Sequence, residues 1–377
     1  MNGVFSFARF KALFIKEFIQ MRRDRATFAM MAGVPLMQLM LFGFAINFDP
    51  KGLPTAIDVA DSGTYARSIV AALDNSSYFK ITRTVHSPSE AEDLLDRGDV
   101  TFAVTIPGNF SRDLMRGTNP QILIEADATD PAAASNALGA LGQLALSALK
   151  DDLVGPLAAK NGKPPFEIVV QRRYNPDNIT SYNIVPGLMA IILTMTMVTI
   201  TSIAMTRERE RGTLENLLAM PAHPLEVMLA KIIPFVFVGY IQVILVLLGA
   251  KFIFAVPMTG SILLLLGVVG VFIAANLAVG FTFSTLARSQ LQAMQMSVFF
   301  LLPAILLSGF AFPFRGMPGW AQDIGEVLPS THFLRMVRGI LLKGNSFPEI
   351  WPNLWPLFIF LLVAGSIAML RYQRTLD

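Results

Sequence analysis

The chain has 377 residues, of which 53% are hydrophobic and only 15% are charged, and its mean hydropathy is +0.54. This composition is too apolar for an ordinary soluble domain and places the chain among integral membrane proteins. The absence of cysteine excludes disulfide bonds, thiolate catalysis and cysteine-based zinc sites. Basic residues gather at the ends of apolar runs, so the isoelectric point of about 9.2 indicates membrane topology and no nucleic-acid binding.

Residues 1–26 predict an interfacial helix on the cytoplasmic face of the membrane. Its phenylalanines recur at helical spacing, at Phe7, Phe10, Phe14 and Phe18, while lysines and arginines occupy the other faces. A basic tail with only a topological role is the alternative.

The first predicted span covers residues 27–47, an apolar run long enough to cross the hydrocarbon core of a bilayer. Three arginines precede it, and they predict a cytoplasmic N-terminus: Arg22, Arg23 and Arg25. A cleaved signal peptide is the alternative, but the run is long, begins late and has no small-residue cleavage site after it.

Residues 48–182 have a soluble composition and, following one predicted span, are expected outside the cytoplasm. Five segments have the composition of strands: TAIDVAD, YFKITRTV, VTFAVTIP, QILIEADAT and FEIVVQRRY. Helical stretches around residues 65–73, 88–95 and 109–116 lie between them, and a long alanine-rich helix is expected over about residues 131–159. This alternation predicts an inserted extracytoplasmic α/β domain.

Five further apolar runs predict spans over residues 184–206, 227–254, 261–286, 294–312 and 354–370. The fold class is therefore an α-helical membrane protein with six transmembrane helices, and both termini are expected in the cytoplasm. Four basic residues on the predicted outer side oppose this orientation mildly: Arg315, Arg335, Arg338 and Lys343. We expect the loop that carries them to have an explanation of its own.

A charged segment, RERERGTLENLLAMP, follows the second predicted span directly. Its alternating charges, from Arg207 to Arg211, continue the helix out of the membrane, and charges three residues apart can pair. Gly212 loosens that helix, Thr213 can cap a new one, and Pro221 closes it. The leucine stripe of so short a helix needs a surface to lie against. A positive-inside stop signal followed by a connector is the alternative.

The residues Glu208 to Pro221 resemble the signature of ABC-2 type transporter permeases, in which E-R-x-x-G-T-x-E-x-L-L and a proline follow the second span. The order of the parts also matches the family over essentially the whole chain. The large loop after the first span is similar to bacterial multidrug-efflux permeases, proteins of the cytoplasmic (inner) membrane.

The resemblance implies that residues 213–220 form a coupling helix on a separate ATPase subunit, which would bind ATP and magnesium. The residues that it assigns to coupling are Arg207, Glu208, Arg209, Glu210, Arg211, Gly212, Thr213, Leu214, Glu215, Leu217 and Leu218. It further implies a homodimer, or pairing with a similar permease, within membrane lipid. Contact with a periplasmic adaptor is left open.

The second and fifth spans are those that the resemblance assigns to the substrate pathway at a two-fold interface. Their candidate pathway residues are Met189, Thr196, Thr199, Gln295 and Phe299. Hydroxyl groups allow close helix packing and methionine adapts to varied shapes. Plain helix packing and lipid contact remain the alternative for any single residue.

Residues 313–344 resemble the family's re-entrant external segment. Prolines at positions 313, 318 and 329 interrupt any continuous helix, and apolar residues follow at helical spacing. Because non-helical backbone at membrane depth must be covered by protein or water, we expect this segment to cover a cavity. An ordinary surface loop is the alternative.

Several kinds of chemistry are missing from the sequence. No G-x-x-x-x-G-K-[ST] loop occurs, so the chain is not expected to hydrolyse ATP or to be an enzyme. The spans lack central ionisable residues, which argues against an ion-coupled carrier. The three histidines have no metal-ligand neighbours, so no metal or other cofactor is expected in this chain.

These features together predict the permease subunit of an ABC exporter, which moves an amphipathic or lipophilic compound, drug-like or lipid-like, out of the cytoplasm or inner leaflet. A membrane receptor or signalling subunit with an external sensor domain is the alternative. The two differ in that only the transporter predicts ligand-stimulated ATP hydrolysis by a partner and vectorial transport.

Overall fold

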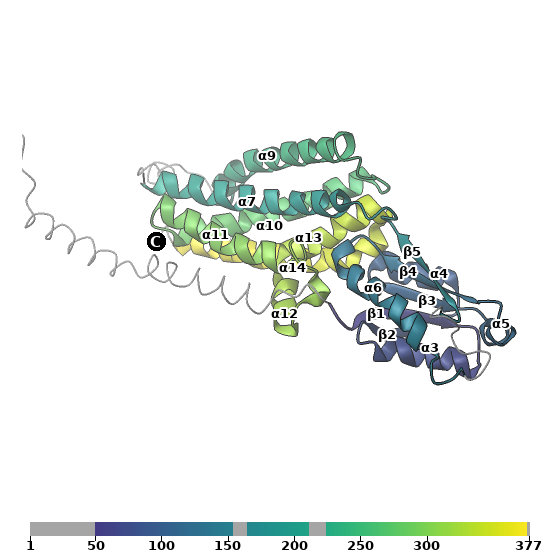
Figure 1. Ribbon diagram of the computed structural model, residues 1–377. Coiled ribbons are helices and arrows are strands. Elements are labelled where there is room, and N and C mark those ends of the chain that lie inside the picture. Colours follow the sequence, from purple (N-terminus) through teal and green to yellow (C-terminus); the bar gives the residue numbers. More distant parts are fainter. Residues whose placement is uncertain (1–49, 154–163, 211–223, 375–377) are drawn as a thin grey trace, which may run out of the picture.

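A computed structural model describes residues 50–153, 164–210 and 224–374 of the chain (Figure 1). The described residues form two parts. We call residues 50–153 and 164–173 the α/β region, and the elements from Thr180 to Arg374 the helical region. The predicted interfacial helix, the predicted span over residues 27–47 and the predicted coupling helix lie outside the described residues.

The α/β region contains a five-stranded sheet with the strand order β2-β1-β3-β4-β5. The strands are β1 (Leu53–Val59), β2 (Phe79–Thr84), β3 (Phe102–Ile106), β4 (Gln121–Asp127) and β5 (Glu167–Arg173). Strand β1 runs parallel to both β2 and β3, and β4 runs parallel to β5. Only the pair β3 and β4 is antiparallel among the pairs that the structure describes. All five predicted strand segments therefore form strands.

Four helices connect and cover these strands: α3 (Thr64–Asn75), α4 (Pro88–Arg97), α5 (Phe110–Arg116) and α6 (Pro131–Ser147). Local sequence sets the ends of α4. The Ser87 side chain accepts a hydrogen bond from the Glu90 amide, and Glu90 in return accepts from the His86 amide. At the other end, Gly98 adopts a left-handed conformation with φ of 74°, which favours glycine.

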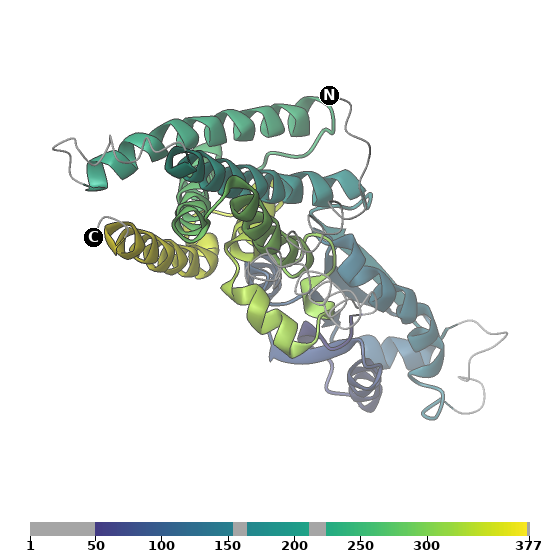
Figure 2. The same cartoon turned by 90° about the vertical axis from the view of Figure 1, so that its left-hand side faces the viewer.

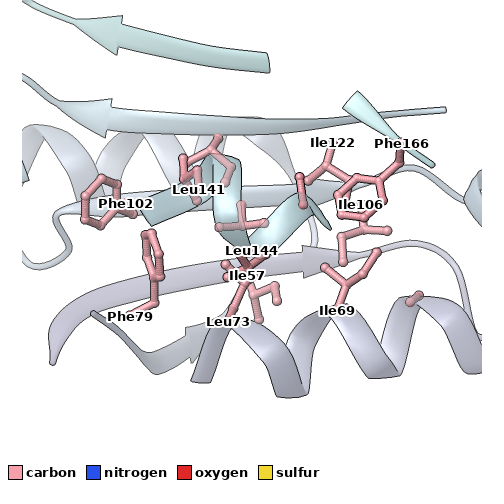
Figure 3. Packing of buried hydrophobic residues seen from close by; sticks show 14 of the residues in the cluster. Ile57, Ile69, Leu73, Phe79, Phe102, Ile106, Ile122, Leu141, Leu144 and Phe166 are labelled. Atoms are coloured by element: carbon pink, nitrogen blue, oxygen red, sulfur yellow. The ribbon is translucent and has the colours of Figure 1, made fainter. Parts of the chain in front are cut away.

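The core of the α/β region lies between the sheet and helices α3, α5 and α6 (Figure 3). Aromatic side chains fill it in edge-to-face pairs, with ring centroids 5.0 Å apart for Phe79 and Phe102 and 5.7 Å apart for Phe110 and Phe166. All four rings are fully buried. Each such side chain stabilises the fold by about 1.5–3 kcal/mol relative to an exposed one, so this region has a core of its own.

Five long helices make up most of the helical region (Figure 2): α7 (Thr180–Glu210), α9 (Pro224–Phe252), α10 (Ile262–Leu286), α11 (Gln290–Leu306) and α14 (Phe347–Arg374). Four of them, α7, α9, α10 and α14, contain stretches long and apolar enough to cross a membrane. Within the described residues α11 is a shorter apolar helix. The total of six spans stays a prediction, because the first lies outside the described residues.

Helix α11 differs from the predicted span over residues 294–312. It begins earlier, where the Ser289 side chain accepts a hydrogen bond from the Gln292 amide. It ends at Leu306, although the apolar sequence continues to Phe312. The reason is backbone conformation, since Gly309 has a φ of 86° and turns the chain.

Helix α10 lies at the centre of the bundle and packs against α7, α9 and α14. The approach to α7 is close at Gly280, where an added Cβ would lie 2.7 Å from the carbonyl oxygen of Val198. Helix α10 also contacts α13, where the rings of Phe272 and Phe333 stack with their centroids 3.9 Å apart. The centre of the bundle is therefore an aliphatic core that contains one stacked aromatic pair.

The segment between α11 and α14 folds back onto the bundle. It consists of η4 (Phe314–Gly316), α12 (Gly319–Val327), α13 (Pro329–Arg338) and a π-helical turn, η5 (Gly339–Lys343). Nearly every residue of α13 is buried, and the helix packs against α7, α10 and α14. Protein therefore covers α13, whereas α12 leaves Trp320, Ile324 and Val327 exposed. That it re-enters the membrane stays a prediction.

The α/β region lies at one end of the helical bundle (Figure 1). Helix α4 packs there against η5 and the beginning of α14, and α6 contacts η4. We call this the inner-contact end of the bundle. The end of α7 and the beginning of α11 lie at the other end, which we call the motif end because it carries Arg207 and Glu210.

Candidate functional site

The charged motif is joined to helix α11 at the motif end. The Gln290 amide donates to one carboxylate oxygen of Glu210 at 2.8 Å, and the Gln290 side chain donates to the other at 2.5 Å. Arg207 Nε donates to Gln290 Oε1 at 3.3 Å. These hydrogen bonds from Gln290 lower the pKa of Glu210 below its ordinary value. Arg207 and Glu210 therefore meet through Gln290.

The structure does not describe the side chains of the remaining predicted coupling residues. The side chains of Glu208 and Arg209 lie outside the described part, as do the following residues entirely: Arg211, Gly212, Thr213, Leu214, Glu215, Leu217 and Leu218. Their role stays a prediction. The structure adds that the base of the motif, at Glu210, is bonded to helix α11.

The predicted pathway residues fall on two neighbouring helices, α7 and α11. The Ser202 and Ser297 hydroxyl oxygens lie 2.9 Å apart and join these helices. Met189 is 1% exposed and packs in the core against α10. The other four face outward to different degrees: Thr196, Thr199 and Gln295 are half-buried, and Phe299 is 42% exposed. A role in the pathway stays a prediction for all five.

The inner-contact end holds the four basic residues that opposed the predicted orientation. Lys343 Nζ donates to the Asp127 carboxylate at 2.6 Å and to the Leu95 carbonyl at 2.7 Å. The same ammonium group lies 5.0 Å from the centre of the Tyr174 ring. Lys343 is thus a buried junction between the helical region and the α/β region.

Arg338 is buried between α7 and the end of α11. One of its terminal nitrogens donates to Asn183 Oδ1 at 2.8 Å and the other to the Gly309 carbonyl at 3.3 Å. Asn183 in turn donates to the Thr129 carbonyl at 2.9 Å, which extends the chain of contacts into the α/β region. Burial lowers the pKa of the Arg338 guanidinium.

Arg335 and Arg315 complete the set. Arg335 forms an ion pair with Glu326 at 2.6 Å and lies over the Phe314 ring at 4.5 Å. Arg315 donates to the Gly98 carbonyl at 2.7 Å. Every one of the four basic residues therefore has a defined structural partner, which accounts for positive charge on the predicted outer side.

Three side chains from the helical region cap the carboxyl end of α4. The carbonyls of Leu95, Asp96 and Gly98 accept hydrogen bonds from Lys343, Asn345 and Arg315, the second at 3.0 Å. The last carbonyls of a helix lack partners within it and carry partial negative charge. Two cations and an amide from the helical region fill this need, and they attach the α/β region to the bundle.

Comparison with known proteins gives the family. A family model described as ABC-2 family transporter protein matches residues 25–370 of the chain. The chain belongs to the ABC-2 family. This ABC-2 chain is 29% identical over 368 residues to the probable multidrug ABC transporter permease YbhR of Escherichia coli strain K12, with 98% of this chain and 99% of that one covered.

Two further similarities accompany the family match. The inner membrane transport permease YhhJ of Escherichia coli strain K12 is 31% identical over 383 residues, with 96% of each chain covered. Among solved structures, a domain of a putative ABC type-2 transporter from Thermotoga maritima MSB8 aligns with 32% of this chain and 84% of that one. That alignment has 22% identity and a TM-score of 0.28.

Sequence reasoning on this ABC-2 chain missed two sets of residues. One is Gln290, which belongs to no motif and can be recognised only because α11 begins beside the end of α7. The other comprises Asp127, Asn183 and Asn345, which contact partners far away in the sequence. The only available signal was the unexplained positive charge after α11.

Proposed function

We propose that the chain is the permease subunit of an ABC exporter that moves an amphipathic or lipophilic compound out of the cytoplasm or inner leaflet. The observation that carries this proposal is the family match over residues 25–370. YbhR, to which the chain is similar, is a probable multidrug ABC transporter permease, and this supports a drug-like cargo. The chain has no phosphate-binding loop, so a separate ATPase subunit would bind ATP and magnesium.

The coupling helix over residues 213–220 would dock on that ATPase subunit. The bonds from Gln290 to Glu210 support this role, because they join the base of the motif to α11. A displacement of the motif would thereby reach a second helix directly, without passing through the core of the bundle. Rigid-body movement of this kind is a common way to carry a conformational change between subunits.

The proposed topology has six spans, both termini in the cytoplasm and the α/β region outside, in a bacterial inner membrane. Two observations support it. The α/β region and the motif lie at opposite ends of the bundle, as opposite sides of a membrane require. The family model also matches from residue 25, so the apolar run over residues 27–47 that would form the first span lies within the matched part.

Helices α7 and α11 would line the substrate pathway at the interface with a second copy or a similar permease. Their outward faces carry exposed apolar side chains that suit such an interface: Leu188, Ile192, Met195, Met294, Val298 and Phe299. Thr196, Thr199 and Gln295 would add polar contacts to it. Membrane lipid would cover the remaining apolar surface, and a periplasmic adaptor is a further candidate partner of the α/β region.

The decisive experiment measures ATP hydrolysis by the chain purified together with its cognate ATPase subunit in lipid vesicles. We expect a Glu215→Arg, Leu217→Asp double variant to lose partner binding and stimulated hydrolysis, with uptake of an amphipathic dye lost in parallel. Asp74→Arg, on the exposed surface of α3, is the matched control and should leave all three unchanged.

Unchanged partner binding in the double variant would contradict the coupling role and leave the motif as a topological stop signal. A ligand effect on a different cytoplasmic output, without vectorial uptake of the dye, would instead favour the receptor alternative.

A further inference from the structure

A chamber of about 680 Å³ lies between the α/β region and the segment from η4 to α14. Its walls come from both parts of the chain: residues 96–101 and 127–130 on one side, and residues of α12, α13 and the beginning of α14 on the other. This volume is in the range of known small-molecule sites. The chamber thus adjoins the contacts that hold the two parts together.

Two arginines in the chamber form no ion pair with a carboxylate among the described residues, although carboxylates such as Asp127 lie near enough to act on both through their charge. Arg338 is only 9% exposed, its Nε makes no hydrogen bond, and its other nitrogens meet only an amide and a carbonyl oxygen. Arg315 meets only the Gly98 carbonyl. Burial lowers the pKa of the Arg338 guanidinium, and loss of water together with the nearby Arg335 cation lowers the pKa of Arg315. The chamber therefore has positive charge available for an anion.

Two carboxylates in the same chamber likewise form no ion pair in the described structure, although Arg315 acts on Asp99 and Arg97 acts on Glu349 through their charges. Asp99 makes no side-chain hydrogen bond, and Glu349 accepts only from the Ser346 amide and hydroxyl. By contrast, Lys343 and Arg335 form ion pairs with Asp127 and Glu326, each at 2.6 Å. The chamber thus holds charges of both signs that no ion pair occupies, which suits a ligand that carries both.

The chamber also lies at the level where a membrane surface is expected. Helix α14 is a candidate span, and its first turns expose the aromatic side chains Phe347, Trp351 and Trp355. Aromatic belts of this kind mark the boundary between hydrocarbon and headgroups. Trp355 is 48% exposed and also lines the chamber, so the chamber adjoins the apolar surface of α14.

We propose that the chamber binds the headgroup of a zwitterionic phospholipid, with the phosphate at Arg315 and Arg338 and the amine at Asp99 and Glu349. Charge-assisted hydrogen bonds from guanidinium to phosphate are among the strong ones in proteins. This inference goes beyond the proposed function, because it concerns binding at the inner-contact end and does not depend on transport.

The test measures lipid retention by mass spectrometry on the intact purified protein. Wild type is expected to retain phosphatidylethanolamine in preference to phosphatidylglycerol. Arg315→Gln should weaken phosphatidylethanolamine binding roughly tenfold, through loss of a charge-assisted contact. Arg112→Gln, whose exposed side chain lies on α5, is the matched control and should bind like wild type.

Asp99→Asn tests the proposed amine site separately from the proposed phosphate site. It should reduce the preference for phosphatidylethanolamine over phosphatidylglycerol while leaving phosphate binding intact. Equal retention by wild type and Arg315→Gln, or a preference for phosphatidylglycerol in wild type, would overturn the proposal.

Competition with soluble glycerophosphoethanolamine, which has the headgroup but no acyl chains, tests whether the ligand is a lipid or a water-soluble compound. If it fails to displace the lipid at matched concentration, the tail contributes and the lipid is the ligand. If it displaces the lipid completely, the charge chemistry holds but the lipid assignment is overturned in favour of a water-soluble ligand.

Discussion

The two ends of the helical bundle use similar polar residues in opposite ways. At the inner-contact end, Lys343 and Arg338 are buried and each contacts two or more distant segments. At the motif end, Glu210, Gln290 and Arg207 form a network at the surface. A buried polar contact is costly to break because its partner is left without water, whereas an exposed contact exchanges readily with solvent.

This difference indicates which end is fixed and which can move. The inner-contact end holds the α/β region on the bundle through contacts that break only at a high cost. The motif end joins α7 to α11 through contacts that can form and break with little change in stability. Under the proposed function the ATPase subunit would act at the motif end, so the end that it contacts would be the one that can move.

The largest effect is expected from Lys343→Met, which leaves the Asp127 carboxylate buried without its cation. Loss of one partner of a buried ion pair costs about 3–5 kcal/mol, so the thermal unfolding midpoint of the purified protein should fall strongly. Lys150→Met, at an exposed position, should not change it. A small shift for Lys343→Met would show that water reaches this pair and that the inner-contact end is not fixed.

Asn183→Ala is expected to have the next largest effect. It removes both the acceptor for Arg338 and the donor to the Thr129 carbonyl, and hydrogen bonds to charged groups contribute about 1.5–3 kcal/mol. Thermal unfolding is the measurement, with Asn75→Ala on the exposed surface of α3 as the control. If both variants unfold like wild type, Arg338 has another acceptor.

Ser202→Ala tests the middle of the bundle, between the two ends. Hydrogen bonds between membrane helices contribute about 0.6 kcal/mol on average, so a small but measurable loss of stability is expected. A double-mutant cycle with Ser297→Ala isolates the bond between the hydroxyl groups. Purely additive effects would mean that the two hydroxyl groups do not interact.

Glu210→Gln should have the smallest effect on stability, and that effect should depend on pH. Because Gln290 lowers the pKa of Glu210 below its ordinary 4.5, the ionised carboxylate stabilises the fold above that pH. The stabilisation is lost as the pH falls through the folded-state pKa. The difference in unfolding midpoint between wild type and Glu210→Gln should therefore shrink on acidification, and a constant difference would contradict the contact.

Local signals predicted the strands and most helices of the α/β region, but the helix predicted over about residues 131–159 ends at Ser147. Ser87 and Gly98 mark the two ends of α4, and alternation of apolar residues marks each strand. The order of the strands could not be predicted in the same way. It depends on which strands pair across the chain, for example β4 with β5, and no single segment encodes that choice.

The contacts at the inner-contact end could not be predicted, because they join residues far apart in the sequence. Lys343 and Asp127 are separated by 216 positions, and nothing near either one indicates the other. The predicted end of α11, at residue 312, was wrong for a different reason. The apolar sequence continues past Leu306, but the helix ends there and the backbone turns at Gly309. Composition defines where a helix is apolar and does not define where it stops.

The single antiparallel pair in the sheet, β3 with β4, determines where the chain enters and leaves the α/β region. Strands β1, β2 and β3 run one way, and β4 and β5 run the other. The start of β1 at Leu53 and the end of β5 at Arg173 therefore lie at the same end of the strands, separated across the sheet by β3 and β4. The chain thus enters and leaves the α/β region on the side of the bundle, so both of its covalent connections lie beside the contacts that hold this region in place.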